Sequence, residues 1–332
     1  MAVEIVTVKD SEDGLRLDRF LKARYPALGF GQLQKILRTG QVRVDGARAK
    51  PQVRLEAGQS VRIPPLGEAA AKDASAARPK PDDRDAAFIR SLVLYEDKDV
   101  MVLNKPHGLA VQGGSGTTRH IDGMLAALTG PDGERPKLVH RLDRDTAGCL
   151  VIAKNRKAAS VLGKTFNSRS ARKIYWALVP GVPEPRQGRI STYLAKGGAH
   201  GEEKMHVAKH GDREASHAIT YYAVVEKAGK QAAWLSLKPV TGRTHQLRAH
   251  LEHIGHPILG DPKYGTDRKL PEGLAEDLSD KLLLLARRIT LPKPGGGTID
   301  VTAPLPEHFK AAFAHFGFDP KGEDPILKAP ED

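Results

Sequence analysis

The chain has 332 residues, more than one typical domain contains, so we expect two domains. Its net charge of +12 and pI near 9.6 favour a polyanionic partner, first of all nucleic acid, over a basic surface with no specific partner. Cys149 is the only cysteine, which excludes a disulfide within the chain and a metal cluster held by several thiolates.

The first ten residues lack the basic and apolar regions of a signal peptide. No apolar run approaches the roughly 18 residues that a membrane-spanning helix needs. We therefore expect a cytoplasmic protein.

The first sixty residues predict a small module of helices and strands. Leu17, Phe20 and Leu21 are spaced for one helical face and predict a helix over residues 15–25, and the same spacing predicts a second helix over residues 31–40. Short strands are expected at residues 3–8, 41–46, 53–55 and 60–63.

This segment also carries most of the net charge. Residues 14–63 hold eleven Lys or Arg and three Asp or Glu, a local charge of +8 that suits a phosphate backbone. Two short helices followed by basic strands and a Val-Arg-Val-Asp-Gly turn resemble an S4-type RNA-binding module; the alternative is a basic cap that only aids solubility. The bases expected to contact RNA are Arg16, Arg19, Lys35, Arg38 and Arg43.

Residues 64–87 are rich in Ala, Pro, Lys and Asp and have no apolar periodicity, which predicts a flexible linker. The expected organisation is an S4-like domain over residues 1–64, a linker over 65–87, a large domain over 88–318 and a tail over 319–332, with the last dozen residues disordered.

The large domain begins with two apolar runs around a Glu-Asp-Lys-Asp turn, which predict a hairpin over residues 92–106. Residues 111–116 are glycine-rich but lack the Gly-Lys-Ser/Thr ending of a phosphate-binding loop, and where that ending occurs, at residues 163–165, Ala158 occupies the required glycine position. We therefore expect no nucleoside-triphosphate site. Further elements are expected at residues 156–167, 173–179, 216–226, 232–239, 282–291, 298–302 and 306–316.

Residues 138–154 join a charged segment to an apolar run. The run that follows Gly148 predicts a buried strand, and the charged segment predicts a loop at the edge of that strand. Arg141, Asp143, Arg144 and Asp145 lie in this loop, and a rigid strand beside a loop is a common setting for catalytic groups. Taken alone, the pattern also fits a surface turn stabilised by ion pairs.

Two other segments carry candidate site residues. Alternation along residues 173–179 places Lys173 and Tyr175 on the face opposite Trp176, although a tyrosine in a strand is usually a packing residue. Residues 242–257 predict a helix with Thr244 as N-cap and Gly255 just beyond its C-terminus. Four histidines in that segment match no common zinc spacing.

The segment His-Arg-Leu-Asp-x-x-Thr-x-Gly at residues 140–148 resembles the catalytic motif of RluA-type pseudouridine synthases. Residues 103–106 (Leu-Asn-Lys-Pro), 172–179 and 242–248 (Gly-Arg-Thr-His-Gln-Leu-Arg) also match that family, in family order, and residues 255–261 extend the last match. Residues 113–116 and 140–146 are most similar to members that act on large-subunit ribosomal RNA. Ala147 departs from the family, which has serine there, and we expect this to affect loop rigidity more than chemistry.

The resemblance implies that Asp143 is the essential carboxylate, acting on the sugar or the uracil ring or as a base. Arg248, with Arg243 as the alternative, would keep it ionised. Tyr175 would stack on the uracil and is a candidate for removing the C5 proton, although a phenol is a weak base. Arg141 would fill the space of a flipped uridine. His140 and Arg243 are expected to contact RNA, and Lys105, His107 and Lys173 are expected to contact phosphate or the pocket, with a structural role as the equal alternative for these last three.

The resemblance further implies an α+β fold: a small S4-type module and a catalytic domain built on a mixed, mostly antiparallel β-sheet flanked by helices. The isomerisation changes no redox state and consumes no water, so we expect no cofactor and no metal. The expected partner is large-subunit ribosomal RNA or a pre-ribosomal particle, and the expected state is a monomer. The alternatives are a non-catalytic RNA-binding assembly factor and a synthase that acts on tRNA.

Overall fold

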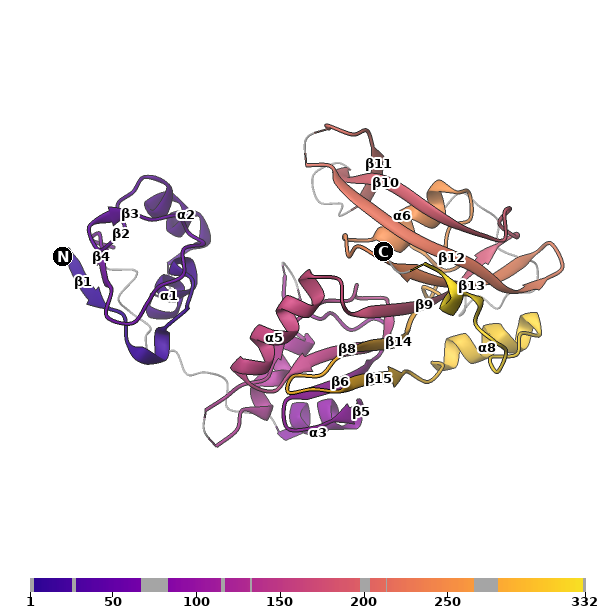
Figure 1. Cartoon of the computed structure of the whole chain (residues 1–332), viewed down its shortest axis with the longest axis horizontal. Coiled ribbons are helices and arrows are strands. Elements are labelled where there is room, and N and C mark those ends of the chain that lie inside the picture. The colour runs from indigo at the N-terminus through magenta and orange to yellow at the C-terminus, as the bar shows by residue number, and fades with distance from the viewer. Residues whose placement is uncertain are drawn as a thin grey trace. The chain divides into compact units, whose positions relative to one another are not determined.

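The computed structural model describes residues 3–25, 28–66, 83–114, 117–131, 133–197, 204–212, 214–265 and 280–330. The chain forms two compact units, Met1–Lys80 and Pro81–Asp332 (Figure 1). Each unit has its own apolar core.

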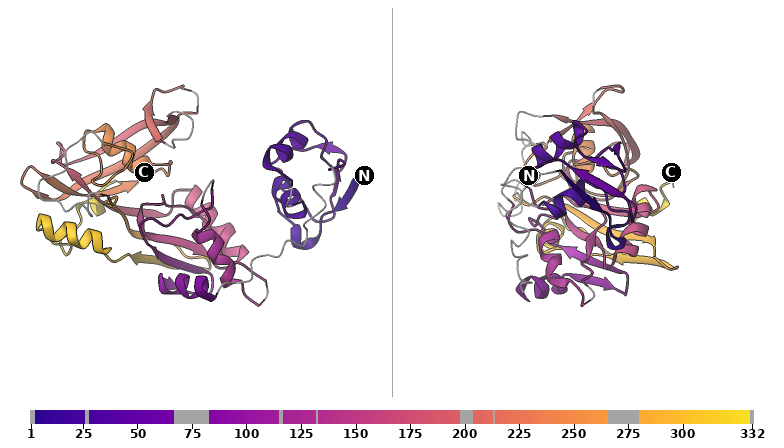
Figure 2. Two further views of the ribbon diagram at one scale, coloured as in Figure 1. Left: turned by 180° about the vertical axis from the view of Figure 1, so that it is seen from behind. Right: turned by 90° about the vertical axis from the view of Figure 1, so that its left-hand side faces the viewer.

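The described residues of the first unit form a four-stranded antiparallel sheet, two α-helices and one short 3-10 helix; Figure 2 shows the chain from behind. Its strands, in the sheet order β1-β4-β2-β3, and its helices are β1 (Glu4–Thr7), β4 (Ser60–Ile63), β2 (Arg43–Val44), β3 (Ala47–Arg48), η1 (Asp10–Glu12), α1 (Leu17–Arg24) and α2 (Phe30–Arg38). Leu17, Phe20 and Leu21 are fully buried, which confirms the predicted helical face. The strand predicted at residues 53–55 is wrong, because Arg54 forms only an isolated bridge with Arg16.

Both ends of the predicted linker are ordered, so its bounds of 65–87 are wrong. Leu66 is buried in the core of the first unit. Helix α3 (Asp83–Ser91) begins the second unit, and its Ile89 is fully buried. Ala86 and Ile89 provide an apolar face that sequence reading overlooked among the charged residues. Residues 67–82, the middle of the predicted linker, lie outside the described residues.

The second unit is built on an eleven-stranded sheet. Its main path runs β11-β10-β12-β13-β9-β14-β8-β6-β5, with β15 paired to β14 and β7 paired to β8. All pairs are antiparallel except β14–β8, which confirms the predicted mixed, mostly antiparallel sheet. The strands are β5 (Val93–Glu96), β6 (Val100–Lys105), β7 (Lys137–Leu138), β8 (Ala147–Ala153), β9 (Arg172–Pro180), β10 (Gln187–Gly197), β11 (Lys204–Ala208), β12 (Ser216–Ala228), β13 (Ala232–Pro239), β14 (Leu284–Pro292) and β15 (Thr298–Thr302).

Helices lie along this sheet, with α5 beside β8 and α6 beside β10 and β12 (Figure 1). After α3, the helices among the described residues of this unit are α4 (Ile121–Met124), η3 (Leu125–Leu128), α5 (Arg156–Asn167), α6 (Gln246–His253), α8 (Glu307–Phe316) and η4 (Pro325–Lys328). The helix predicted at residues 156–167 is confirmed. Within the described residues, no helix has both the length and the apolar character to cross a membrane.

The end of the chain packs on the sheet, so the prediction of a disordered last dozen residues is wrong for those that are described. Ile326 in η4 is 1% exposed. Asp324 accepts hydrogen bonds from Trp176 Nε1 at 3.1 Å and Ser236 Oγ at 2.7 Å. One buried apolar side chain and one anchored carboxylate hold a segment whose composition alone predicts disorder.

Gly148 lies where β8 runs alongside β14. Its φ is +109°, and a Cβ atom there would lie 2.3 Å from the backbone oxygen of Ala286. We expect Gly148→Ala to destabilise the fold by about 2–4 kcal/mol through steric overlap and backbone strain, measured by urea unfolding. Gly163→Ala, inside α5 with open space around it, is the control and should be neutral or stabilising. Equal stability of the two variants would contradict this geometry.

Candidate active site

The loop before β8 is held from both sides. The Val151 N–H donates to His140 Nε2 at 2.8 Å, and the His140 ring stacks on Phe166 at 4.4 Å. Burial, with the nearby charge of Lys173, lowers the pKa of His140 to about 3, so the ring is neutral and remains an acceptor. His140 therefore anchors the loop to the strand, a structural role beside its predicted RNA contact.

The middle of the loop is tied to the turn after β6. Arg144 Nε donates to Gly108 O at 3.2 Å, and the buried Lys105 ammonium donates to the carbonyls of Pro106, Leu109 and Arg144 at 2.7–2.8 Å. Lys105 is 0% exposed, so its predicted RNA contact is wrong. A lysine in an Asn-Lys-Pro turn looks available to phosphate in the sequence, and only the three-dimensional fold shows that it lies beneath the loop.

Ala147 is not a loop residue. It is the first residue of β8, it is 1% exposed and it pairs with Leu285 of β14. The expectation that Ala147 alters loop rigidity is wrong, because its side chain packs in the apolar core.

A second loop, between β13 and α6, is shaped by Gln246. The Gln246 side chain is buried, accepts from Thr241 Oγ1 at 2.6 Å and from the Arg243 N–H at 3.1 Å, and donates to Ile219 O. These bonds hold the chain in the turn that leads into the helix. His245, the residue before the helix, has a left-handed backbone with φ +49°.

Helix α6 begins later than predicted. Its N-cap position is His245, so the prediction of Thr244 as N-cap is wrong. Gly255, with φ +82°, ends the helix as predicted: its N–H donates to Glu252 O, and the His256 N–H donates to Leu251 O.

The two loops and strand β9 enclose a pocket of about 450 Å³. Asp143 comes from the first loop, Tyr175 from β9 and Arg248 from α6, and all three line this pocket. Other predicted site residues that line it are His140, Arg141, Lys173 and Arg243. Asp143 and Tyr175 are 32 residues apart and Tyr175 and Arg248 are 73 residues apart, so three separate segments of the chain bring their candidate groups to one cavity.

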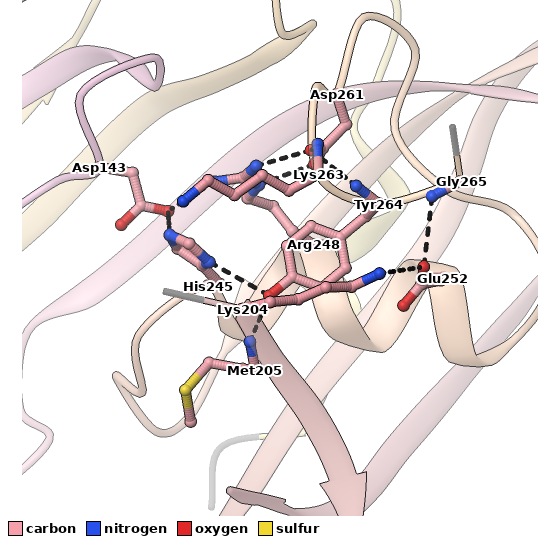
Figure 3. A network of polar contacts seen from close by, with 10 residues as sticks. All are labelled: Asp143, Lys204, Met205, His245, Arg248, Glu252, Asp261, Lys263, Tyr264 and Gly265. Carbon is pink, nitrogen blue, oxygen red and sulfur yellow. Dashed lines mark hydrogen bonds and ion pairs between the residues drawn. The ribbon is translucent and has the colours of Figure 1, made fainter. Parts of the chain in front are cut away.

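Arg248 is 2% exposed and lies between two carboxylates (Figure 3). Its Nε and Nη2 donate to Asp261 at 2.7 and 2.6 Å, and its Nη1 lies 3.7 Å from Asp143 Oδ2. Burial opposes the charge on Arg248, but the hydrogen bonds and the charge of Asp261 outweigh it and raise the pKa of the guanidinium. Asp261 therefore orients a permanent cation whose free edge faces Asp143.

Tyr175 faces the pocket while Trp176, on the opposite face of β9, packs against Trp234 and Phe313. Burial raises the pKa of Tyr175, and the charge of Asp143 raises it further. A phenolate is thus disfavoured, which argues against Tyr175 as the base for the C5 proton and leaves its flat ring as a packing surface.

The pocket is basic. Among the described residues that line it, Asp143 is the only carboxylate, whereas its cations are Arg141, Arg169, Lys173, Arg243 and Arg248. Burial, with the charge of Arg169, lowers the pKa of Lys173. Such an excess of positive charge around one carboxylate fits a polyanionic substrate.

Comparison with known proteins agrees with this geometry. A family model of RNA pseudouridylate synthases matches residues 99–253. The chain is 36% identical to ribosomal large subunit pseudouridine synthase C of Escherichia coli strain K12, over 93% of this chain and 95% of that protein. It is 35% identical to the protein of the same name from Haemophilus influenzae, over 93% of this chain and 94% of that protein.

The chain belongs to the RluA family of pseudouridine synthases. The solved structure of human RNA pseudouridylate synthase domain containing 4 superposes with a TM-score of 0.60 at 29% identity, covering 71% of this chain and 98% of that one. Human RNA pseudouridylate synthase domain containing 1 gives a TM-score of 0.51 at 28% identity, covering 64% of this chain and 83% of that one. The protein is accordingly an RNA pseudouridine synthase, an isomerase of uridine in RNA.

Three residues at the site of this pseudouridine synthase were missed from the sequence. Asp261 holds Arg248, His245 Nε2 lies 3.9 Å from Asp143 Oδ2, and Tyr264 contacts His245 (Figure 3). A signal was present for Asp261, because a buried arginine needs a carboxylate partner and Asp261 ends a family-matched segment. For His245 and Tyr264, nothing in the spacing indicated that they meet.

The other predicted RNA contacts of the synthase differ in their exposure and in the groups that they contact. Arg141 is exposed at the pocket edge, as an RNA-contacting residue requires. Arg243 is also exposed, and its Nε donates to His217 O at 3.1 Å rather than to Asp143. His107 packs edge-on against His308, and burial lowers its pKa.

In the first unit of the synthase, four predicted RNA contacts have exposed side chains: Arg19, Lys35, Arg38 and Arg43. The fifth, Arg16, is bound to Asp18 by two hydrogen bonds, of 3.1 and 2.6 Å.

Proposed function

We propose that this chain isomerises specific uridines in large-subunit ribosomal RNA, with Asp143 as the reacting group. The observation that carries the chemistry is the meeting of Asp143, Tyr175 and Arg248 in one pocket. The substrate class is supported by the printed names of relatives that match 93% of this chain.

The reaction breaks the bond between N1 of uracil and C1′ of ribose, turns the uracil and forms a bond between C5 and C1′. C5 loses a proton and N1 gains one, so atoms and electrons balance without an oxidant or a water molecule. A carboxylate serves each available route, as a nucleophile toward the sugar or the ring or as a base. Asp143 is the only carboxylate among the described lining residues, so each route starts from it.

The neighbours of Asp143 support this role. Arg248, fixed by Asp261, supplies a positive charge 3.7 Å from Asp143 Oδ2, next to the reacting group. Tyr175 lines the same pocket and offers its ring to the detached uracil. Burial raises the pKa of its phenol, which disfavours the phenolate.

The target uridine has to leave its stack before it reaches the pocket, at a cost of a few kcal/mol. Arg141 is exposed two residues before Asp143 and carries a planar guanidinium that stacks on bases and contacts phosphate. We propose that Arg141 occupies the vacated space while Asp143 meets the sugar.

Mapping with carbodiimide tests the proposal, because this reagent marks pseudouridine. In cells lacking the gene, we expect one or more pseudouridines to disappear from large-subunit RNA, to return with the wild-type gene and not to return with Asp143→Asn. Loss confined to tRNA would assign the enzyme to tRNA. An unchanged map, or restoration by the Asn variant, would contradict the proposed reaction.

The first unit is proposed to bind RNA through its exposed bases, as an S4-type module would. Replacing the four exposed bases with alanine in the full-length chain should weaken RNA binding and reduce the slope of log K against log salt by about 2–3. These bases are Arg19, Lys35, Arg38 and Arg43.

The matched control for that variant removes lysines whose charge is balanced locally. Lys310 pairs with Glu307 at 2.7 Å and Lys328 pairs with Glu323 at 3.0 Å. Alanine at both positions should leave the slope within about 0.5 of the wild-type value. If the fourfold variant keeps the wild-type slope of log K against log salt, the four bases do not contact RNA and the first unit serves only as an aid to solubility.

A further inference from the structure

We propose that His245 is a positioning residue for Asp143: Tyr264 fixes it as the neutral tautomer that carries its proton on Nε2, and this N–H is directed at the Asp143 carboxylate. The inference deepens the proposed function and rests on it. Figure 3 shows the chain of contacts from Met205 through Tyr264 and His245 to Asp143.

Counting donors and acceptors assigns the tautomer. The Met205 N–H, on strand β11, donates to Tyr264 Oη at 2.8 Å, so this oxygen already acts as an acceptor. Tyr264 is 1% exposed, and the other hydrogen-bond partner of its hydroxyl among the described residues is His245 Nδ1 at 3.1 Å. The phenol O–H therefore donates a hydrogen bond to Nδ1. With the opposite tautomer, the buried O–H would have no acceptor, at a cost of about 1–3 kcal/mol.

With Nδ1 accepting, the ring proton lies on Nε2, which is 3.9 Å from Asp143 Oδ2. Arg248 Nη1 approaches the same oxygen at 3.7 Å. These distances exceed those of hydrogen bonds, as is common for catalytic groups before substrate binds. Two donors thus converge on Oδ2 and direct the other carboxylate oxygen, Oδ1, toward the uridine.

The surroundings keep both rings neutral. Burial lowers the pKa of His245 and outweighs the charge of Asp143, which raises it, while the charges of Arg248 and Lys263 act in the same direction as burial. Burial raises the pKa of Tyr264 to about 12, so its hydroxyl retains the proton that it donates.

The backbone of His245 is also specialised. A non-glycine residue with φ +49° is uncommon and is kept only where the surrounding structure determines it. Gln246 holds the preceding turn through Thr241 and Arg243, which directs the imidazole toward Asp143 at the start of α6. Strain at this position is consistent with a role at the site rather than in general packing.

The tautomer can be measured without RNA, by ¹⁵N NMR of protein labelled at histidine, with the His245 signals assigned by their loss in His245→Gln. At pH 7.5 we expect an unprotonated Nδ1 and a protonated Nε2, and we expect Tyr264→Phe to shift the Nδ1 signal. A proton on Nδ1, or an imidazolium, would overturn the proposal even if the enzyme isomerises uridine.

Kinetics then test the link to Asp143. His245→Leu should lower kcat about 100-fold with KM for the RNA unchanged, because one donor to Asp143 is lost. His245→Gln places an amide N–H near the position of Nε2 and should recover at least a tenth of the wild-type kcat. Tyr264→Phe should lower kcat about tenfold, and Tyr222→Phe, which loses a hydrogen bond to Pro185 O elsewhere, should not.

A purely structural role predicts a different pattern. In that case the thermal midpoint falls, kcat per folded molecule stays at the wild-type value, and Gln offers no advantage over Leu. That result would overturn the proposal, and the Gln and Phe variants keep the test valid if the Leu variant does not fold. A wild-type enzyme that forms no pseudouridine would refute the proposed function instead, with the NMR result still standing on its own.

Discussion

Asp143→Asn is expected to slow pseudouridine formation by about 10⁴-fold or more under single-turnover conditions, with RNA affinity nearly unchanged. Asparagine keeps the size of the side chain but provides neither a nucleophilic carboxylate nor a base. Asp143 is also the only carboxylate among the described residues that line the pocket, so we expect no neighbour to replace it. The measurement is the rate of conversion of large-subunit RNA fragments, read by chromatography of the digested nucleosides.

Asp145→Asn is the matched control for this variant. Asp145 lies in the same loop and contacts Arg144 at 3.6 Å, but it is not among the residues that line the pocket. Its rate should stay within about threefold of the wild-type rate, and both variants should keep the wild-type thermal midpoint within a few degrees. Comparable losses in the two variants would assign the effect to the loop as a whole and not to Asp143.

The second large effect concerns stability. Asp261→Ala should lower the free energy of unfolding by about 3–5 kcal/mol, because it leaves the guanidinium of Arg248 buried without its bidentate partner. It also removes the acceptor for the N–H groups of Lys263 and Tyr264. Urea unfolding with two spectroscopic probes measures the change, and activity should fall as Arg248 loses its orientation.

Arg288 and Asp300 provide the comparison. They form the same bidentate arrangement, but their side chains are 37% and 40% exposed. Asp300→Ala should cost less than about 1 kcal/mol, because water screens the pair and solvates the remaining charge. If both alanine variants lose the same free energy of unfolding, burial does not determine how much the Arg248–Asp261 pair stabilises the fold.

The sequence predicted the main architecture because its strongest signals are local. Apolar runs and helical spacing identified the core of β8 and the whole of α5, and motif order indicated the mixed sheet. The misassigned segments are those where few residues decide the outcome: Ile89 in α3 and Ile326 in η4 each anchor a chain segment whose composition otherwise predicts disorder.

The residues of the candidate site also fall into those with a local sequence signal and those placed only by the three-dimensional fold. Asp143, Tyr175 and Arg248 lie in recognisable motifs, and the fold brings all three to one pocket. Lys105 was misassigned because its burial depends on the loop that crosses over it, whose Arg144 carbonyl lies 39 residues away and accepts from the Lys105 ammonium. The contact between His245 and Tyr264 depends on a left-handed backbone residue, which no periodicity in the sequence reports.

The central claim is that uridine in large-subunit RNA isomerises at Asp143, and the stoichiometry of proton loss at C5 tests it most directly. Purified protein is incubated with a large-subunit RNA fragment labelled with tritium at C5 of uridine, and released tritium is compared with pseudouridine found by chromatography. We predict one tritium released for each pseudouridine formed by the wild-type chain, and neither product with Asp143→Asn. Pseudouridine formed by the Asn variant, or no release from this RNA by the wild-type chain, would contradict it.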